Sequence, residues 1–237
     1  MSRSFTIPLG WGEFVELKIS EPALRAQGLS LQTWTSSFVL AGLLHKIDVD
    51  PLASSAFTIL EFGAGTGLVG LAAATLWRTP VVLTDLPPIV PGLVANVEFN
   101  KKAVKGLVQC GSLDWVAPDS LLLHNGQCYS ADTDKVQMIL AADTVYSEEH
   151  PEILSKAILR WLAPGSLSRV IITYPMRVAY LDQIRELWTL LNIGGLEAIA
   201  EGQEQACVDD WDDECLCEWS VWRWKLNSNP PDCNIAD

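Results

Sequence analysis

Residues 61–67 read EFGAGTG and are the most informative stretch of the chain. They follow Phe57–Glu61, an apolar run typical of a buried strand, and they precede Leu68–Trp77, which has the composition of a helix. Glycine at a strand-to-helix turn lets the chain change direction sharply and lets a ligand approach the backbone with no Cβ in the way. The stretch therefore predicts a ligand site where the first core strand meets a helix.

Outward from this turn, short apolar runs alternate with helix-like segments, a pattern that indicates βαβ units and a mostly parallel sheet. Further strands are predicted at 81–85, 107–109, 136–142, 170–174, 196–200 and 218–225, and helices at 31–46, 87–100, 151–162 and 180–192. The helix at 31–46 is expected to cover one sheet edge. We predict a single α/β Rossmann-like domain with a seven-stranded, doubly wound sheet and helices on both faces. Its core would span 51–226, after a cover segment at 1–50 and before a flexible tail at 227–237.

Composition narrows the class of protein. With 237 residues, 49% of them hydrophobic and 19% charged, the chain is long and apolar enough for one globular domain. It has no apolar stretch of about 18 residues, and its first residues lack a signal-peptide pattern, so we expect no membrane span and a cytoplasmic or nuclear location. Cys215 and Cys217 do not have the spacing of a zinc site, and no metal is predicted.

The chain is acidic, with 16 basic and 29 acidic residues and a net charge of −13. No basic stripe that could displace counterions from phosphates is visible, so nucleic acid is a poor candidate partner. Acidic residues crowd into 201–218. This segment is either a solvated loop or a docking surface for a basic protein segment.

Two acids are expected at the ligand site. Glu61, at a strand end, is predicted to accept hydrogen bonds from a ligand ammonium, such as that of S-adenosylmethionine (AdoMet). Asp85 ends the next strand, where a carboxylate can accept both hydroxyls of a ribose. The alternative is a nicotinamide-dinucleotide site, because Gly65, Gly67 and Gly70 also satisfy G-x-G-x-x-G. A pyrophosphate next to Glu61 would be repelled, which favours AdoMet.

Two further motifs follow later strands. Asp143 and Tyr146 come after the run at 136–142, where an acid and an aromatic hydroxyl could bracket an amine. Alternatively, Asp143 caps the following turn and Tyr146 packs in the core. Trp115, in GSLDW at 111–115, could stack on a purine, or it could fill the core like others of the 10 tryptophans.

Taken together, ILEFGAGTGLVGL, VVLTDLPPIVPGLVANVEFN, GSLDW and LAADTVYSEEHPEIL resemble the seven-β-strand protein-lysine methyltransferases, methyltransferase family 16. The resemblance covers about 32–174. It implies AdoMet as the cofactor, with Gly63, Ala64 and Gly65 under its methionine moiety, Asp85 at the ribose, Trp115 at the adenine, the Ala142 backbone near the reacting end and Trp34 lining the site. Asp143 to Tyr146 matches the D-x-x-Y motif that the family associates with the substrate amine.

The resemblance implies methyl transfer to a lysine of a protein substrate with a basic or lysine-bearing surface. Three alternatives stay open: a small-molecule N- or O-methyltransferase, a non-catalytic AdoMet-binding protein and, least favoured by the charge, a nucleic-acid methyltransferase. The family often has an acid or proline after the tryptophan, where this chain has Thr35, followed by Ser36 and Ser37. The chain departs from the family pattern at the start of that helix.

Overall fold

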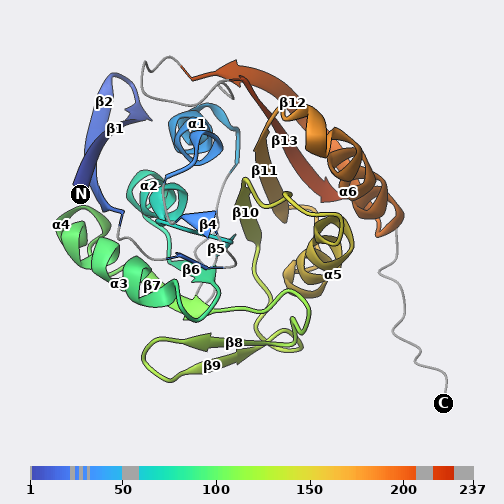
Figure 1. Ribbon diagram of the computed structural model, residues 1–237, viewed down its shortest axis with the longest axis horizontal. Coiled ribbons are helices and arrows are strands. Elements are labelled where there is room, and N and C mark those ends of the chain that lie inside the picture. The colour runs from blue at the N-terminus through green and yellow to red at the C-terminus, as the bar shows by residue number, and fades with distance from the viewer. Residues whose placement is uncertain are drawn as a thin grey trace.

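The computed structural model describes residues 2–21, 25–26, 29–30, 33–49, 59–206 and 216–226. Its centre is a nine-stranded sheet in the order β12-β13-β11-β10-β5-β6-β7-β8-β9 (Figure 1). These strands are β5 (Ile59–Phe62), β6 (Val81–Asp85), β7 (Val108–Ser112), β8 (Ser120–Leu123), β9 (Cys128–Ser130), β10 (Met138–Ala142), β11 (Arg169–Pro175), β12 (Leu196–Gln205) and β13 (Leu216–Trp224). The five central strands, β11, β10, β5, β6 and β7, are parallel to one another. Strand β13 is antiparallel to both of its neighbours, β11 and β12.

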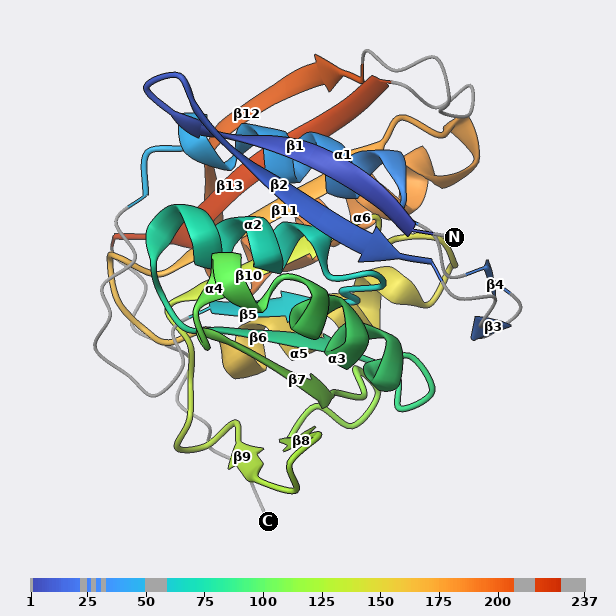
Figure 2. The same cartoon turned by 90° about the vertical axis from the view of Figure 1, so that its left-hand side faces the viewer.

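Helices cover both faces of this sheet. On one face lie α1 (Thr35–Leu43), α2 (Leu68–Trp77), α3 (Val90–Phe99) and α4 (Lys101–Val104), and on the other lie α5 (His150–Trp161) and α6 (Leu181–Ile193) (Figures 1 and 2). Short 3-10 turns, η1 (Leu44–Lys46) and η2 (Val178–Tyr180), follow α1 and precede α6. The predicted α/β class, with a mostly parallel sheet between two helical layers, is confirmed.

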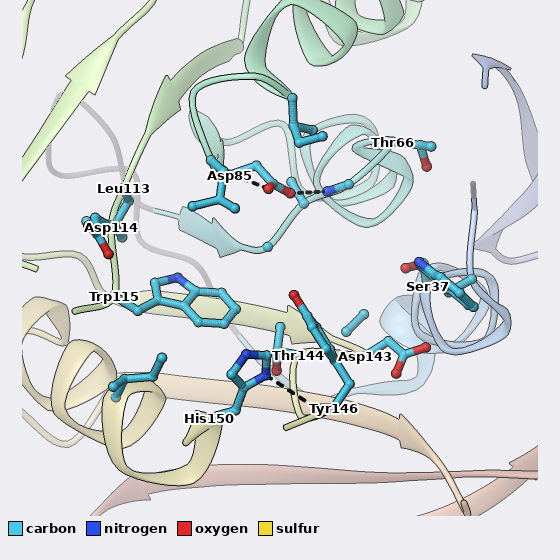
Figure 3. Close-up of a pocket in the computed structure, with 18 of the residues that line it drawn as sticks. Ser37, Thr66, Asp85, Leu113, Asp114, Trp115, Asp143, Thr144, Tyr146 and His150 are labelled. Carbon is cyan, nitrogen blue, oxygen red and sulfur yellow. Dashed lines mark hydrogen bonds between the residues drawn. The ribbon is translucent and has the colours of Figure 1, made fainter. Parts of the chain in front are cut away.

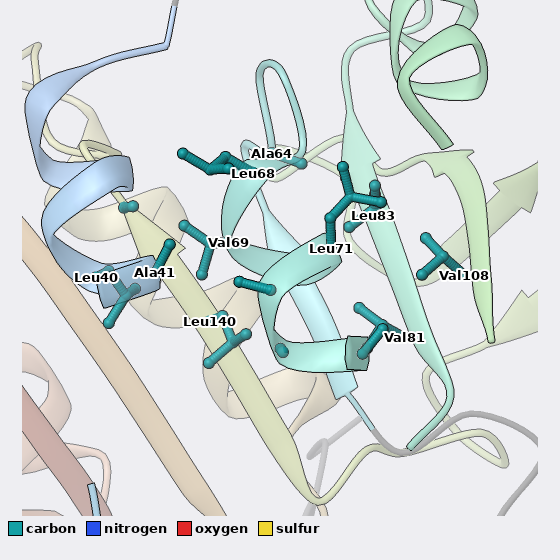
Figure 4. Close-up of a cluster of buried hydrophobic side chains, with 14 of the residues drawn as sticks. Leu40, Ala41, Ala64, Leu68, Val69, Leu71, Val81, Leu83, Val108 and Leu140 are labelled. Carbon is teal, nitrogen blue, oxygen red and sulfur yellow. The ribbon is translucent and has the colours of Figure 1, made fainter. Parts of the chain in front are cut away.

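Each face has its own core. Helix α2 is buried along most of its length, and Figure 4 shows it beside α1, with Leu71 near Leu83 and Val69 near Leu140. The opposite core is built around Trp161, Trp222 and other large side chains of β10, β11, α5 and α6. The parallel strands β5, β10 and β11 are buried on both faces, which explains why they read as continuous apolar runs.

The sequence prediction missed three antiparallel strand pairs. Strands β1 (Ser2–Gly10) and β2 (Glu13–Ser20) pair as an antiparallel hairpin outside α2 and α3 (Figure 2). Strands β8 and β9 extend the sheet beyond β7, so the sheet has nine strands rather than seven. Two further short strands, β3 (Arg25–Ala26) and β4 (Leu29–Ser30), pair with each other. All of these strands are short or exposed on one side, so their apolar signal is weak.

The first helix also differs from the prediction. Helix α1 begins at Thr35 and packs on α2, β11, β13 and β10, so it covers a face of the sheet rather than an edge. Helix α3 begins at Val90 instead of the predicted residue 87. The residues before it form a turn, in which the Ile89 N–H donates to the Leu86 carbonyl. The boundaries of the domain remain a prediction, since 50–58 and 227–237 lie outside the described residues. Within the described ranges, no helix is long and apolar enough to cross a membrane.

Candidate cofactor and acceptor site

The carboxyl ends of β5, β6, β7 and β10 meet around one cavity, as expected at the crevice of a doubly wound sheet. Nine of the ten predicted site residues line it (Figure 3): Trp34, Gly63, Ala64, Gly65, Asp85, Trp115, Ala142, Asp143 and Tyr146. The sequence motifs, which lie far apart along the chain, therefore form a single site.

The glycine turn has the conformation that its sequence predicts. Gly63, Gly65 and Gly67 have φ values of 59°, 57° and 82°, in the left-handed region that favours glycine. A Cβ on Gly63 would lie 3.2 Å from the Trp115 ring, so the close approach of that ring depends on glycine. A Cβ on Gly65 would meet only the Gly63 carbonyl, at 4.0 Å, which leaves open space beside the turn.

Asp85 ties the glycine turn to the end of β6. Its Oδ2 accepts a hydrogen bond from the Gly65 N–H at 2.7 Å, and its Oδ1 accepts one from the Leu86 N–H at 2.7 Å. Burial raises the pKa of this carboxyl above its ordinary value, against the effect of the two N–H donors. A carboxylate has about four acceptor sites, so Asp85 retains capacity for ligand hydroxyls.

Glu61 does not occupy the predicted position. Its side chain is 2% exposed and lies outside the cavity lining, because its Oε2 accepts the Gly70 N–H in the first turns of α2 at 2.8 Å. Burial raises its pKa to about 8, and the negative charge of Asp85 adds to the rise. The geometry therefore gives Glu61 a role in joining β5 to α2, in place of the predicted contact with a ligand ammonium.

Trp115 is a wall of the cavity and also packs on the core. Its ring stacks on Phe62, with centroids 6.2 Å apart and planes 23° apart, and it meets the edge of His150 at 5.8 Å. Figure 3 shows the indole spanning the cavity floor between Asp114 and Tyr146. Both interpretations of this tryptophan are thus compatible with its position, since core packing holds the ring against the cavity.

Asp143 is neither a simple helix cap nor a free carboxylate. Its backbone has φ 57°, and its two carboxylate oxygens accept hydrogen bonds from Arg177 at 2.6 and 3.0 Å. Arg177 also lies over the Trp34 ring, with 5.6 Å between the guanidinium carbon and the ring centroid. The sequence reasoning missed Arg177, which follows β11 and has no motif of its own.

Tyr146 and His150 complete the turn after β10. The Tyr146 N–H donates to His150 Nδ1 at 3.3 Å, and the two rings meet edge to face at 4.2 Å. In Figure 3 the Tyr146 hydroxyl points into the cavity, whereas Asp143 points toward the helix that carries Ser37. Burial raises the pKa of Tyr146, with contributions from Asp85 and Asp143, and burial lowers the pKa of His150.

Several lining residues were not predicted: Ser37, Thr66, Leu86, Ile89, Leu113, Asp114, Val116, Thr144, His150 and Ile153. For two of them a signal was available. Ser37 lies three residues after Trp34, about one turn further along the predicted helix, and His150 lies four residues after Tyr146, immediately before the helix predicted at 151–162.

The cavity suits a zwitterionic nucleoside such as AdoMet. Thr144 lines the cavity beside Gly63, and its buried Oγ1 has no hydrogen-bond partner among the described residues. The glycine turn, the Asp85 carboxylate and the Trp115 ring supply a polar cradle, a hydroxyl acceptor and an aromatic wall. In the described part of the chain, no cluster of three or more His, Cys, Asp or Glu residues could hold a metal ion.

Solved structures with this fold include several methyltransferases. A putative RNA methyltransferase from Pyrococcus horikoshii superposes with a TM-score of 0.54 and 13% identity, covering 81% of this chain and 83% of that one. Magnesium protoporphyrin IX methyltransferase from Synechocystis, with bound S-adenosylhomocysteine, has a TM-score of 0.53 and 12% identity, covering 81% and 82%. This chain therefore has the Rossmann-like fold that these methyltransferases share.

The chain belongs to the lysine methyltransferase family, whose profile matches residues 13–186. The protein-lysine N-methyltransferase EFM2 of Saccharomyces cerevisiae is 34% identical over 212 residues, which are 82% of this chain and 48% of EFM2. The protein-lysine N-methyltransferase rrg1 of Schizosaccharomyces pombe is 30% identical over 227 residues, 94% of this chain and 70% of rrg1. The chain thus spans about half the length of EFM2. The resemblance inferred from the sequence is confirmed, and AdoMet is the methyl donor that this family uses.

Proposed function

We propose that this protein transfers methyl groups from AdoMet to a lysine side chain of a protein substrate. One observation carries the proposal: the glycine turn after β5 and the Asp143–Tyr146 turn after β10 line the same cavity. A donor held on the first turn would face an acceptor entering beside the second, since β5 and β10 are neighbours in the sheet. The family membership and the names of EFM2 and rrg1 support lysine as the acceptor.

The chemistry places two demands on the chain. Bound AdoMet supplies a methyl group on a positively charged sulfur, and an amine attacks it in line. A lysine ammonium, with a pKa of about 10.4 in model peptides, has no free lone pair and must lose its proton first. The buried turn at Asp143–Tyr146 favours the neutral amine, because burial disfavours charge. The remaining contribution of the chain is positioning of donor and acceptor.

Charge near the cavity supports a basic partner. Asp114 lines the cavity and is exposed, and Glu148 and Glu149 are exposed between Tyr146 and His150. These acids, together with the net charge of −13 of the whole chain, would attract a lysine-bearing segment and repel a nucleic acid. Residues 207–215, which hold five of the eight acids of the segment at 201–218, lie outside the described residues, so its role as a docking surface stays a prediction. The cytoplasmic or nuclear location also stays a prediction.

Transfer of tritiated methyl from AdoMet tests the proposal. The purified protein would be incubated with tritiated AdoMet and a lysate whose own methyltransferases have been inactivated by heat, with the Asp85→Ala variant as the control. We expect label in a protein band with the wild-type chain and a weaker band with the variant. Label only in the small-molecule fraction would indicate a metabolite methyltransferase. No label together with AdoMet binding would indicate a non-catalytic binding protein.

A further inference from the structure

Arg177 lies just outside the cavity lining, where it contacts two lining residues, Asp143 and Trp34, and it has no role in the function proposed so far. It follows β11 by two residues, where the Met176 N–H donates to the Leu216 carbonyl at 2.9 Å and the Arg177 N–H donates to the Pro175 carbonyl at 2.8 Å. Its backbone is therefore anchored to the end of the sheet. Because the backbone is fixed, the direction of the Arg177 side chain is restricted, and its guanidinium reaches Asp143, which follows the end of β10.

The pair between Arg177 and Asp143 has the geometry of a strong ion pair. Two guanidinium nitrogens donate to the two carboxylate oxygens at 2.6 and 3.0 Å. The side chains are 16% and 6% exposed, so water competes little for either partner. Bidentate pairs of this kind fix direction as well as distance. Removal of one partner would leave a buried charge without compensation.

Arg177 also holds the start of α1. Its guanidinium carbon lies 5.6 Å from the centroid of the Trp34 ring, within the range of a cation–π contact. Trp34 lies just before α1, and the neighbouring Thr33 hydroxyl is 3.0 Å from that of Thr66 in the glycine turn. One guanidinium thus joins three chain segments at the cavity: the ends of β10 and β11 and the start of α1.

Asp143 needs such support because its backbone is strained. A non-glycine residue at φ 57° is in the left-handed region that L side chains rarely adopt, and it persists only where its surroundings fix it. The Asp143 N–H donates to the Thr173 carbonyl at 2.9 Å, and the side chain is held by Arg177. This conformation sets the direction of the next residues, including Tyr146, whose hydroxyl points into the cavity (Figure 3).

We propose that Arg177 is a positioning residue for methyl transfer, which fixes Asp143 and Trp34 at the acceptor end of the cavity. The inference rests on the proposed function, since it assigns Arg177 to the acceptor side of that reaction. It also changes the role of Asp143. The carboxylate is already neutralised by a guanidinium, so Asp143 acts by shaping the acceptor end, and the incoming amine does not need it as a counterion.

A different role for Arg177, as a stand-in for the substrate ammonium, would change the expected effect of its removal. The Asp143 carboxylate beside the Trp34 ring is also a suitable site for a lysine ammonium. In that role Arg177 would block the site until the substrate lysine displaced it. Removal of a blocking Arg177 would raise the rate of transfer or lower the KM of the acceptor. Removal of a positioning residue lowers the rate at saturating acceptor, because a displaced reacting group loses orientation.

Three variants test the inference: Arg177→Ala, Arg177→Lys and, as the matched control, Arg160→Ala. Arg160 also pairs with two carboxylates, Asp119 and Asp132, but lies outside the cavity lining. For each, AdoMet affinity is measured by titration and the folded fraction by thermal melting. The rate of tritiated methyl transfer to the lysate band is measured at saturating AdoMet and at lysate concentrations raised until the rate no longer increases. Guanidinium chloride, far below denaturing concentrations, is then added to Arg177→Ala, with potassium chloride at equal ionic strength as the comparison.

We expect Arg177→Ala to lower the rate per folded molecule about tenfold or more, with a smaller change in AdoMet affinity. Arg177→Lys should keep an intermediate rate, and guanidinium should restore part of the rate of Arg177→Ala, whereas potassium should not. Arg160→Ala should melt at a lower temperature and transfer at the wild-type rate. An unchanged or increased rate in Arg177→Ala would overturn the inference. A wild-type chain that labels no protein would contradict the proposed function, and the inference with it.

Discussion

Among single side chains, Asp85 has the most direct link to the cofactor. It accepts two backbone N–H groups and lines the cavity. We predict that Asp85→Ala weakens AdoMet binding by about 1–3 kcal/mol, because ribose hydroxyls lose a charged acceptor and the Gly65 N–H loses its partner. Isothermal titration measures the loss, with Asp119→Ala as a control at an exposed acid outside the lining. Unchanged affinity in a folded Asp85→Ala variant would show that the ribose lies elsewhere.

Glu61 gives a prediction about stability. Its folded-state pKa of about 8 lies above the ordinary value of 4.5, so the folded state keeps a proton that the unfolded state loses. This contribution to stability is complete below pH 4.5 and is lost as the pH rises toward 8. Glu61→Gln keeps an acceptor for the Gly70 N–H and has no carboxyl proton to lose.

We therefore expect the wild-type protein to lose stability relative to Glu61→Gln by about 1.4 kcal/mol per pH unit between pH 5.5 and 7.5. Urea unfolding of the AdoMet-free proteins at several pH values measures the difference. Parallel stability curves for the two proteins would show that Glu61 is ionised in the folded state. A large loss of AdoMet affinity in Glu61→Gln would favour the original prediction of a contact with the ligand ammonium.

Among the helices and strands, the junction of β10 and α5 depends on His150. This residue begins α5, and its Nδ1 accepts the Tyr146 N–H, so the imidazole must be unprotonated at that nitrogen. Its folded-state pKa is lowered by burial, and the associated stability is present above about pH 6.5 and is lost as the pH falls below it. We expect His150→Asn to reduce this loss between pH 7 and pH 5.5, as measured by urea unfolding at the two values. An equal loss in both proteins would assign it to other groups.

The sequence predicted the elements whose residue pattern is sufficient by itself, without contacts from distant parts of the chain. The run before the glycine turn, the turn itself and α2 were read correctly, because both faces of β5 are buried and the turn requires glycine. The hairpin of β8 and β9 was missed, although Asn125 and Gly126 form a turn signal, because its strands bury alternate residues only. Arg177 could not have been found, since its partners come from segments distant in the chain.

For the molecule as a whole, charge predicts how the acceptor is recognised. An acidic protein that binds a lysine-bearing basic segment should lose affinity for it as salt screens the attraction. We expect the KM of the protein acceptor to rise several-fold between about 50 and 300 mM salt, while AdoMet affinity changes much less. Transfer rates at varied acceptor concentration and ionic strength measure this. A KM independent of salt would argue against an electrostatic contribution to docking.

The central claim is that the cavity delivers a methyl group to a lysine. The most direct test is to isolate the labelled protein band, digest it and locate the methyl group by mass spectrometry. The account predicts a methyl group on a lysine Nε, present with the wild-type chain and reduced with Asp85→Ala. Methylation of another side chain at the wild-type rate, or label confined to small molecules, would contradict it.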